Sequence, residues 1–228
     1  MYRAVLLDID GTIVDSNDAH AHAWVDALET SGRRVSFERV RPLIGMGSDK
    51  MLPRIAGVHP DTDEGRALIT RRLEIFMNQY LPDLEPTRGA RALVEWLRDE
   101  RLTIVVATSA DPAEVHALLR VADVAKLVDA ITSSGDVERS KPDPDVVHAA
   151  IVRAGCEARE CIMIGDTPYD VDAARRGGAG IIALRCGGWS DRALDGAQAI
   201  YEDPQDLIDQ YLLSPFKRPL PNSPALSS

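Results

Sequence analysis

The pattern of apolar and polar positions predicts strands that alternate with helices along most of the chain. Short apolar runs rich in branched residues and closed by a polar residue or glycine are typical of buried strands. Such runs cover residues 4–8, 103–107, 130–132, 161–164 and 180–184. Helical segments separate them at residues 89–100, 112–121, 144–154 and 168–176. This alternation predicts an α/β fold, in which a Rossmann-like parallel sheet is covered by helices on both faces.

Three of the predicted helices begin with a polar residue followed by proline, at Asp111-Pro112, Asp143-Pro144 and Thr167-Pro168. A proline at the first helical position loses no hydrogen bond, and the side chain before it can accept a bond from a free backbone N–H. We therefore expect helix starts near the carboxyl edge of the sheet, where open α/β folds bind ligands and anions.

Residues 16–82 interrupt the alternation, because they carry helical periodicity and no strand signal. Two apolar faces recur at helical spacing in this region: His20, Trp24 and Leu28, then Leu68, Leu73, Phe76 and Tyr80. We expect a helical cap domain at residues 16–82, inserted into a core domain formed by residues 1–15 and 83–213. Residues 214–228 hold four prolines and little to bury, so we expect an extended or mobile tail there.

Composition narrows the range of partners. The net charge of −10 over 228 residues argues against binding to nucleic acid or to an anionic membrane. No apolar run approaches the roughly 20 residues that span a bilayer, and the first strand leaves no room for a signal peptide. Cys156, Cys161 and Cys186 lack zinc-type spacing, so we expect reduced thiols in a cytoplasmic protein. The choice between a monomer and a homodimer stays open.

Two aspartates, Asp8 and Asp10, follow the first predicted strand. Strand side chains alternate, so residues two apart project to the same side. Paired carboxylates repel each other unless a cation or a shared proton relieves them. On these residues alone a solvated Asp-Gly turn is the alternative. Asp166 ends another apolar run, which predicts a third acid at the same edge of the sheet.

These residues carry a resemblance to a known family. Four groups resemble, in order and separation, the motifs of the haloacid dehalogenase (HAD) superfamily: Asp8-Ile9-Asp10-Gly11-Thr12, Thr108, Lys141 between Ser140 and Pro142, and Gly165-Asp166 with Asp170. The resemblance spans about residues 2–187, and the insertion is similar to the family's small helical cap. Within the family, the chain is most similar to the phosphoglycolate-phosphatase and β-phosphoglucomutase-like members. The resemblance implies a Mg²⁺-dependent phosphatase that acts on a small phosphorylated metabolite.

The first two acids have separate expected roles. Asp8 is expected to be the nucleophile, because a carboxylate splits phosphate-ester hydrolysis into two steps through an aspartyl phosphate. Asp10 is expected to protonate the leaving oxygen and then to accept a proton from the attacking water. The resemblance implies that Mg²⁺ is held by the carboxylates of Asp8 and Asp166 and by the backbone carbonyl of Asp10.

The remaining motif residues are expected to handle the phosphoryl group. Thr108 offers a hydroxyl, Ser109 a backbone N–H and Lys141 a positive charge to the phosphoryl oxygens. Taken alone, Lys141 is an ordinary surface lysine before a helix, and only its register with the other motifs favours the phosphate role. Asp170 fits a capping box, while the resemblance gives it the task of holding a metal-bound water or Lys141. Both roles stay open for Asp170.

The cap offers two candidate substrate contacts, His20 and Lys50. A histidine on an apolar helical face is more often a packed core residue, and Lys50 and Arg54 are equally well explained as solvated residues. The loop of residues 45–50 looks like the cap loop that reaches the substrate in relatives. We expect the substrate to be decided by such cap residues.

Three other functions remain as alternatives. A phosphomutase of the β-phosphoglucomutase type would use the same core residues. A 2-haloacid dehalogenase is disfavoured by Asp10, because a halide leaving group requires no proton. A non-catalytic binding protein of the HAD fold is disfavoured because the set of motif residues is complete.

Overall fold

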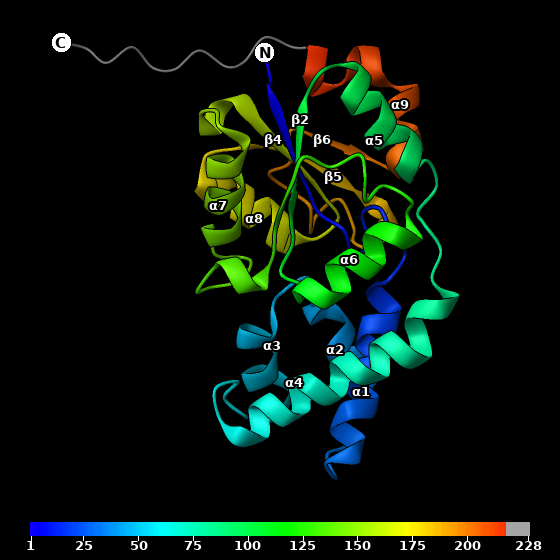
Figure 1. Cartoon of the computed structure of the whole chain (residues 1–228), viewed down its shortest axis with the longest axis vertical. Helices are drawn as coiled ribbons and strands as arrows, with labels where there is room; N and C mark the ends of the chain where they lie inside the picture. Colours follow the sequence, from blue (N-terminus) through cyan, green and yellow to red (C-terminus); the bar gives the residue numbers. More distant parts are fainter. Residues whose placement is uncertain (218–228) are drawn as a thin grey trace, which may run out of the picture.

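The computed structural model describes residues 1–217, and it has a parallel sheet with helices on both faces (Figure 1). Six strands pair in the order β3-β2-β1-β4-β5-β6, all parallel. Their bounds are β1 Ala4–Leu7, β2 Thr103–Ala107, β3 Ala130–Thr132, β4 Cys161–Gly165, β5 Gly180–Leu184 and β6 Ala199–Tyr201. The predicted α/β fold class is therefore confirmed.

Strand β1 lies in the middle of the sheet and packs on both faces. Val5 and Leu7 contact one apolar cluster, which also holds residues of α5 (Ala90–Asp99), α6 (Pro112–Val121) and α9 (Pro204–Asp209). Ala4 and Leu6 contact the opposite cluster, built on α7 (Asp145–Ala154) and α8 (Pro168–Gly177). Each fully buried aliphatic side chain contributes roughly 1.5–3 kcal/mol. This two-sided burial explains the continuous apolar run in the sequence.

The segment between β1 and α5 is helical, and Figure 1 shows its helices together at one end of the molecule. The elements are α1 Asn17–Thr30, α2 Phe37–Val40, α3 Ser48–Ala56 and α4 Asp63–Ile75, followed by a π-helical turn at Phe76–Tyr80. They enclose an apolar cluster of their own, which includes Trp24, Leu28, Leu52 and Leu68. Below, residues 16–82 are called the cap.

Several boundaries predicted from the sequence differ from the structure, most of them by one residue. Helix α7 begins at Asp145, with Pro144 as its N-cap and no capping side chain, so Asp143 does not cap it. The carboxylate of Asp143 instead bonds to Lys50 of the cap. Strand β1 ends at Leu7, one residue earlier than expected. Strand β6 and helix α9 were not predicted, because elements of three and six residues show little periodicity.

The expectation of an extended tail from residue 214 onward is wrong for its first four residues. Ser214, Pro215 and Phe216 are buried, and the Phe216 ring packs edge-on against Trp96 and Tyr2 at centroid distances of 5.5 and 6.2 Å. One aromatic side chain gives this short segment enough apolar surface to bury. The rest of the predicted tail, residues 218–228, lies outside the described residues. No helix within residues 1–217 combines the length and the apolar character that crossing a membrane requires.

Replacing Phe216 by alanine tests this packing. We expect Phe216→Ala to lower the free energy of unfolding by about 3 kcal/mol, because the ring leaves a cavity against Trp96. Leu212→Ala is the control, since Leu212 is 80% exposed and should change stability by less than about 0.5 kcal/mol. Urea unfolding followed by circular dichroism measures both. Equal stabilities of the two variants would contradict the packing argument.

Candidate active site

The carboxyl ends of β1 and β4 bring three acidic residues together. Asp8 directly follows β1 and Asp166 directly follows β4, and the two strands pair in parallel register. Strands β2 and β3 lie on one side of β1, and β4, β5 and β6 lie on the other. The strand order therefore reverses at β1, and open α/β folds bind ligands at such a topological switch point. Asp170 reaches the same point from the first turn of α8. The site is therefore a direct product of the strand order.

Lys141 links two of these acids. Its Nζ lies 2.6 Å from Asp8 Oδ1 and 2.7 Å from Asp170 Oδ1, and all three side chains are buried. Burial alone would lower the pKa of Lys141, but the carboxylates of Asp170 and Asp8 outweigh it and raise that pKa above its ordinary value. Lys141 is therefore held as a cation between the two acids. Asp170 also completes the capping box of α8 with Thr167.

Asp166 is fully buried and accepts hydrogen bonds from neutral donors. The Thr12 hydroxyl donates to Oδ1 at 3.0 Å and the Asn17 amide donates to Oδ2 at 2.8 Å. Burial raises the pKa of Asp166 to about 8, and the nearby Asp170 adds to the shift. A side chain at Gly11 would collide with this carboxylate, so only glycine fits there, at a φ of +72°.

The three acids bring together oxygen donors that suit a hard cation. Asp8, Asp166 and Asp170 each offer one carboxylate oxygen, and these oxygens lie within 4.8 Å of one another. Burial also raises the pKa of Asp8 well above its ordinary value, against the opposing effect of Lys141. One lysine does not balance three buried carboxylates, and oxygen ligands of this kind suit Mg²⁺ or Ca²⁺. The residues present therefore fit a divalent metal.

Asp10 lies beside this cluster in a different environment. Its Oδ1 accepts a hydrogen bond from Ser16 Oγ at 2.6 Å and lies 2.7 Å from His20 Nε2. Burial would raise the pKa of Asp10, but the contacts with His20 and Ser16 dominate and lower it. The His20 ring is buried and stacks on Phe76 at 4.0 Å between centroids. His20 is thus a packed residue, as its spacing suggested, that also contacts a catalytic candidate.

A cavity of about 90 Å³ opens between the core and the cap. Five of the predicted site residues line it: Asp8, Asp10, His20, Thr108 and Ser109. The cap loop contributes Gly45, Met46, Gly47 and Ser48, in agreement with the expected reach of this loop. Lys141, Asp166 and Asp170 are not in the lining. Lys141 contacts two lining residues: its Nζ bonds to Asp8, and its backbone N–H donates to Ser109 Oγ at 3.2 Å.

Lys50 and Arg54 do not line this cavity, so the structure offers no support for their contact with a substrate. Lys50 forms an ion pair with Asp143, and Asp49 beside it accepts a hydrogen bond from Ser140 Oγ. Arg54 contacts the Met46 sulfur at 3.2 Å. Asp49 and Lys50 therefore both bind residues of the loop that carries Lys141.

The sequence interpretation missed two charged residues that line the cavity, Arg72 of the cap and Glu114 of α6. Their side chains form an ion pair, and Arg72 is only 8% exposed. Helical spacing holds a signal for Arg72, because it lies four residues from both Leu68 and Phe76 on the buried face of α4. Glu114 gives no such signal, since an acid in the first turn of a helix is common.

Comparison with known proteins agrees with this geometry. The model of the haloacid dehalogenase-like hydrolase family matches residues 5–184, which include all the site residues. The chain belongs to the haloacid dehalogenase-like hydrolase family. Its parallel sheet with two-sided helices is the fold of this family, and the chain is a hydrolase.

Three similar proteins illustrate the relationship. A solved hydrolase from Pseudomonas syringae is 31% identical, with a TM-score of 0.84 over 91% of this chain and 97% of that one. Phosphoglycolate phosphatase of Pseudomonas savastanoi pv. phaseolicola is 30% identical over 81% of this chain and 70% of its own length. Protein SUPPRESSOR OF QUENCHING 1, chloroplastic, of Arabidopsis thaliana is 32% identical over 80% of this chain, which spans only 18% of that protein.

The raised pKa of Asp166 predicts that the metal-free protein loses stability as pH rises. The folded value of about 8 exceeds the ordinary value of 3.8, so Asp166 must release its proton on unfolding between these limits, and stability falls over that window. We expect Asp166→Asn to stabilise the chelator-treated protein by about 1–3 kcal/mol at pH 8 and much less at pH 5. Urea unfolding at both pH values measures this. A difference that does not depend on pH would contradict the prediction.

Proposed function

We propose that this chain is a Mg²⁺-dependent phosphatase that hydrolyses a small phosphorylated metabolite through an aspartyl phosphate on Asp8. The observation that carries the proposal is the Asp8 carboxylate, buried at the sheet edge, bonded to Lys141 and facing a cavity that Asp10 also lines. The phosphoglycolate phosphatase name of the Pseudomonas savastanoi relative supports a phosphatase.

In the first step, an Asp8 carboxylate oxygen attacks phosphorus and the bond to the leaving oxygen breaks. The leaving oxygen takes a proton from Asp10. In the second step, water attacks the aspartyl phosphate, phosphate leaves and Asp10 receives a proton from the water. The lowered pKa of Asp10, caused by His20 and Ser16 against the effect of burial, favours the form that accepts this proton. The same proton then serves the next leaving group.

The proposed metal ligands are the carboxylates of Asp8 and Asp166 and the backbone carbonyl of Asp10. A bound Mg²⁺ would offset the negative charges of the phosphoryl group and of its nucleophile. Asp170 is proposed to act through Lys141, whose Nζ it contacts at 2.7 Å. Support for two of these ligands, Asp8 and Asp166, comes from their place in a cluster of three buried acids whose carboxylate oxygens lie within 4.8 Å of one another.

Three core residues are proposed to bind the phosphoryl oxygens: Thr108 by its hydroxyl, Ser109 by its backbone N–H and Lys141 by its ammonium group. Thr108 and Ser109 follow β2, and both line the cavity beside Asp8. Donors placed where negative charge develops stabilise the transition state more than the bound substrate.

Residues 16–82 are proposed to form a lid that opens to admit substrate and closes to exclude water. The cap has its own apolar cluster, and both apolar and polar contacts join it to the core. The polar contacts include Tyr169 to the Pro42 carbonyl at 2.6 Å and Arg41 to the Gly187 carbonyl at 2.8 Å. Water can replace such hydrogen bonds on opening. The core cluster also includes Ala23, Ala27, Ile75 and Phe76 of the cap, so these residues are expected to stay with the core or to mark the hinge side of the lid.

Substitution of the nucleophile tests the covalent step. We expect Asp8→Asn to lower kcat by at least about 1,000-fold, because a neutral amide lacks the negative charge of the attacking carboxylate. Asp15→Asn is the matched control, since Asp15 is exposed and close in sequence, and it should retain activity. Phosphate release from p-nitrophenyl phosphate with Mg²⁺ measures both variants. Near-normal turnover by Asp8→Asn would rule out the aspartyl phosphate.

Substitution of Asp10 separates the two proton transfers. We expect Asp10→Asn to slow phosphoryl transfer from an alkyl phosphate by about 100-fold or more, because an alkoxide needs a proton to leave. The loss of rate with p-nitrophenyl phosphate should be at least about tenfold smaller than the loss with the alkyl phosphate, since p-nitrophenolate is stable as an anion. Rapid-quench measurement of the first step compares the substrates. Equal losses for both would show that Asp10 is not the acid for departure.

A further inference from the structure

Arg72 and Glu114 form a buried ion pair across the boundary between cap and core. The Arg72 Nη1 bonds to Glu114 Oε1, with Arg72 8% exposed and Glu114 fully buried. Both residues line the cavity that also contains Asp8 and Asp10. The pair therefore lies in the space where the organic part of a substrate would sit.

Neighbouring groups hold both members of the pair in place. The second carboxylate oxygen of Glu114 accepts a hydrogen bond from the Asp111 backbone N–H at 3.2 Å, as part of the capping box of α6. The Arg72 guanidinium lies 5.3 Å from the ring centroid of Trp24, a cation–π distance. Its Nε is buried and makes no hydrogen bond within the described part of the chain. A buried donor of this kind calls for a partner that the protein itself does not supply.

The charges on the cavity wall disfavour an anionic leaving group. Within residues 1–217, the lining includes four acidic residues: Asp8, Asp10, Asp111 and Glu114. Arg72 is the one arginine or lysine of that lining. Glu114 already offsets the charge of Arg72. A substrate carboxylate at Arg72 would therefore meet the Glu114 carboxylate without a free cation to compensate it.

A hydroxyl group suits the same place better. It can accept a hydrogen bond from Arg72 Nε and donate one to a Glu114 oxygen, so it satisfies the buried donor and adds no charge. Two hydroxyls on neighbouring carbons could divide these bonds between them. The apolar side chains of Trp24, Met51 and Ile69 line the cavity as well and would pack on the carbon chain.

We propose that Arg72 and Glu114 act together as a donor–acceptor pair that selects a neutral, hydroxyl-bearing leaving group over a carboxylate-bearing one. The substrate class is then a polyol or sugar phosphate. This inference rests on the proposed phosphatase function. It also separates this chain from what the phosphoglycolate phosphatase name says of the Pseudomonas savastanoi relative.

Two substrates with one carbon skeleton test the selection. Glycerol 3-phosphate and 3-phosphoglycerate differ only in a hydroxymethyl group against a carboxylate. We expect kcat/KM of the unmodified protein to be at least about tenfold higher for glycerol 3-phosphate. An equal or reversed ratio, or no turnover of glycerol 3-phosphate, would overturn the inference. This comparison depends on no variant.

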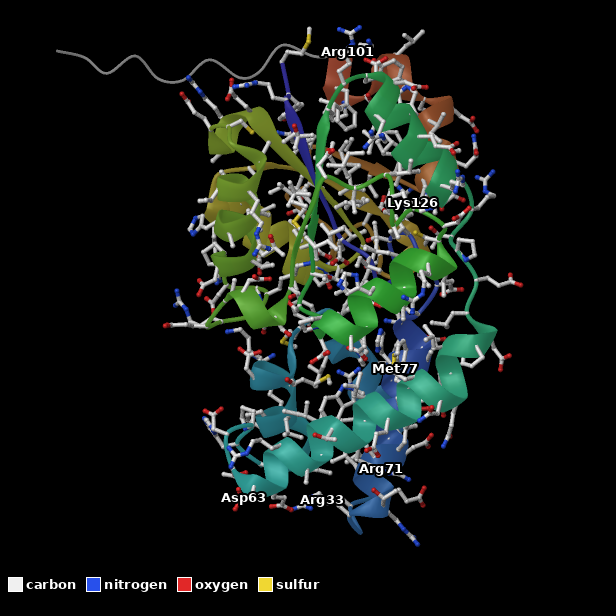
Figure 2. The ribbon with its side chains drawn as sticks, in the orientation of Figure 1. Arg33, Asp63, Arg71, Met77, Arg101 and Lys126 are labelled. Carbon is white, nitrogen blue, oxygen red and sulfur yellow. The ribbon has the colours of Figure 1, made fainter. Side chains whose placement is uncertain are left out.

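Variants then assign the selection to the pair. Glu114→Gln keeps the side-chain shape and removes the negative charge, so Arg72 becomes available to a carboxylate and the ratio should fall about tenfold. Arg72→Met should lower kcat/KM for glycerol 3-phosphate more than for p-nitrophenyl phosphate, whose leaving group lacks alkyl hydroxyls. Arg71→Met is the matched control on the same helix, because Arg71, which is labelled in Figure 2, is exposed. Its ion-pair partner is Glu74. The Arg71→Met variant should keep the original ratio.

The outcomes distinguish this inference from the proposed function. Absence of p-nitrophenyl phosphate hydrolysis with Mg²⁺ would count against the phosphatase itself. Hydrolysis of that reporter without preference for glycerol 3-phosphate would overturn only the role of the pair. A ratio that Glu114→Gln leaves unchanged, in a variant with a normal circular dichroism spectrum, would also overturn it.

Discussion

The excess of buried negative charge at the ends of β1 and β4 constrains the rest of this molecule. Asp8, Asp166 and Asp170 share one lysine, Lys141, and burying each ion costs several kcal/mol before its partners are counted. The two apolar clusters that flank the sheet supply the stability that this arrangement requires. The same excess of charge makes binding of a divalent cation favourable. Stability and chemistry therefore oppose each other at this point of the fold.

The boundary between cap and core combines apolar and polar contacts. The cap encloses one apolar cluster of its own, the core cluster extends into the cap through Ala23, Ala27, Ile75 and Phe76, and charged side chains also join the two. Lys50 with Asp143 and Arg72 with Glu114 are ion pairs of this boundary. Contacts of this kind exchange with water at small net cost when they are exposed, which suits the lid role proposed for the cap. The buried pair of Arg72 and Glu114 differs from such exposed contacts, because buried charged groups need partners whenever the cavity is closed.

Much of the fold was predictable because its strands are buried on both faces. Such strands appear as unbroken apolar runs, and five of the six strands gave that signal. The sixth, Ala199–Tyr201, is too short for its pattern to stand out. The packing of Phe216 was missed for a related reason, since a single aromatic residue among prolines has no periodicity. The prediction that Asp143 is the N-cap of α7 was wrong, because the Asp143 carboxylate binds Lys50 instead.

The sequence by itself determined the central site, because Asp8, Thr108 and Asp166 each directly follow a strand and parallel strands end at one edge of the sheet. Short-range pattern was sufficient for that. Only the tertiary structure decided which distant charges meet. Arg72 and Glu114 are 42 residues apart, and Lys50 and Asp143 are 93 apart. Pairing across such separations depends on how the cap helices pack against the core, and neither spacing nor composition encodes that distance.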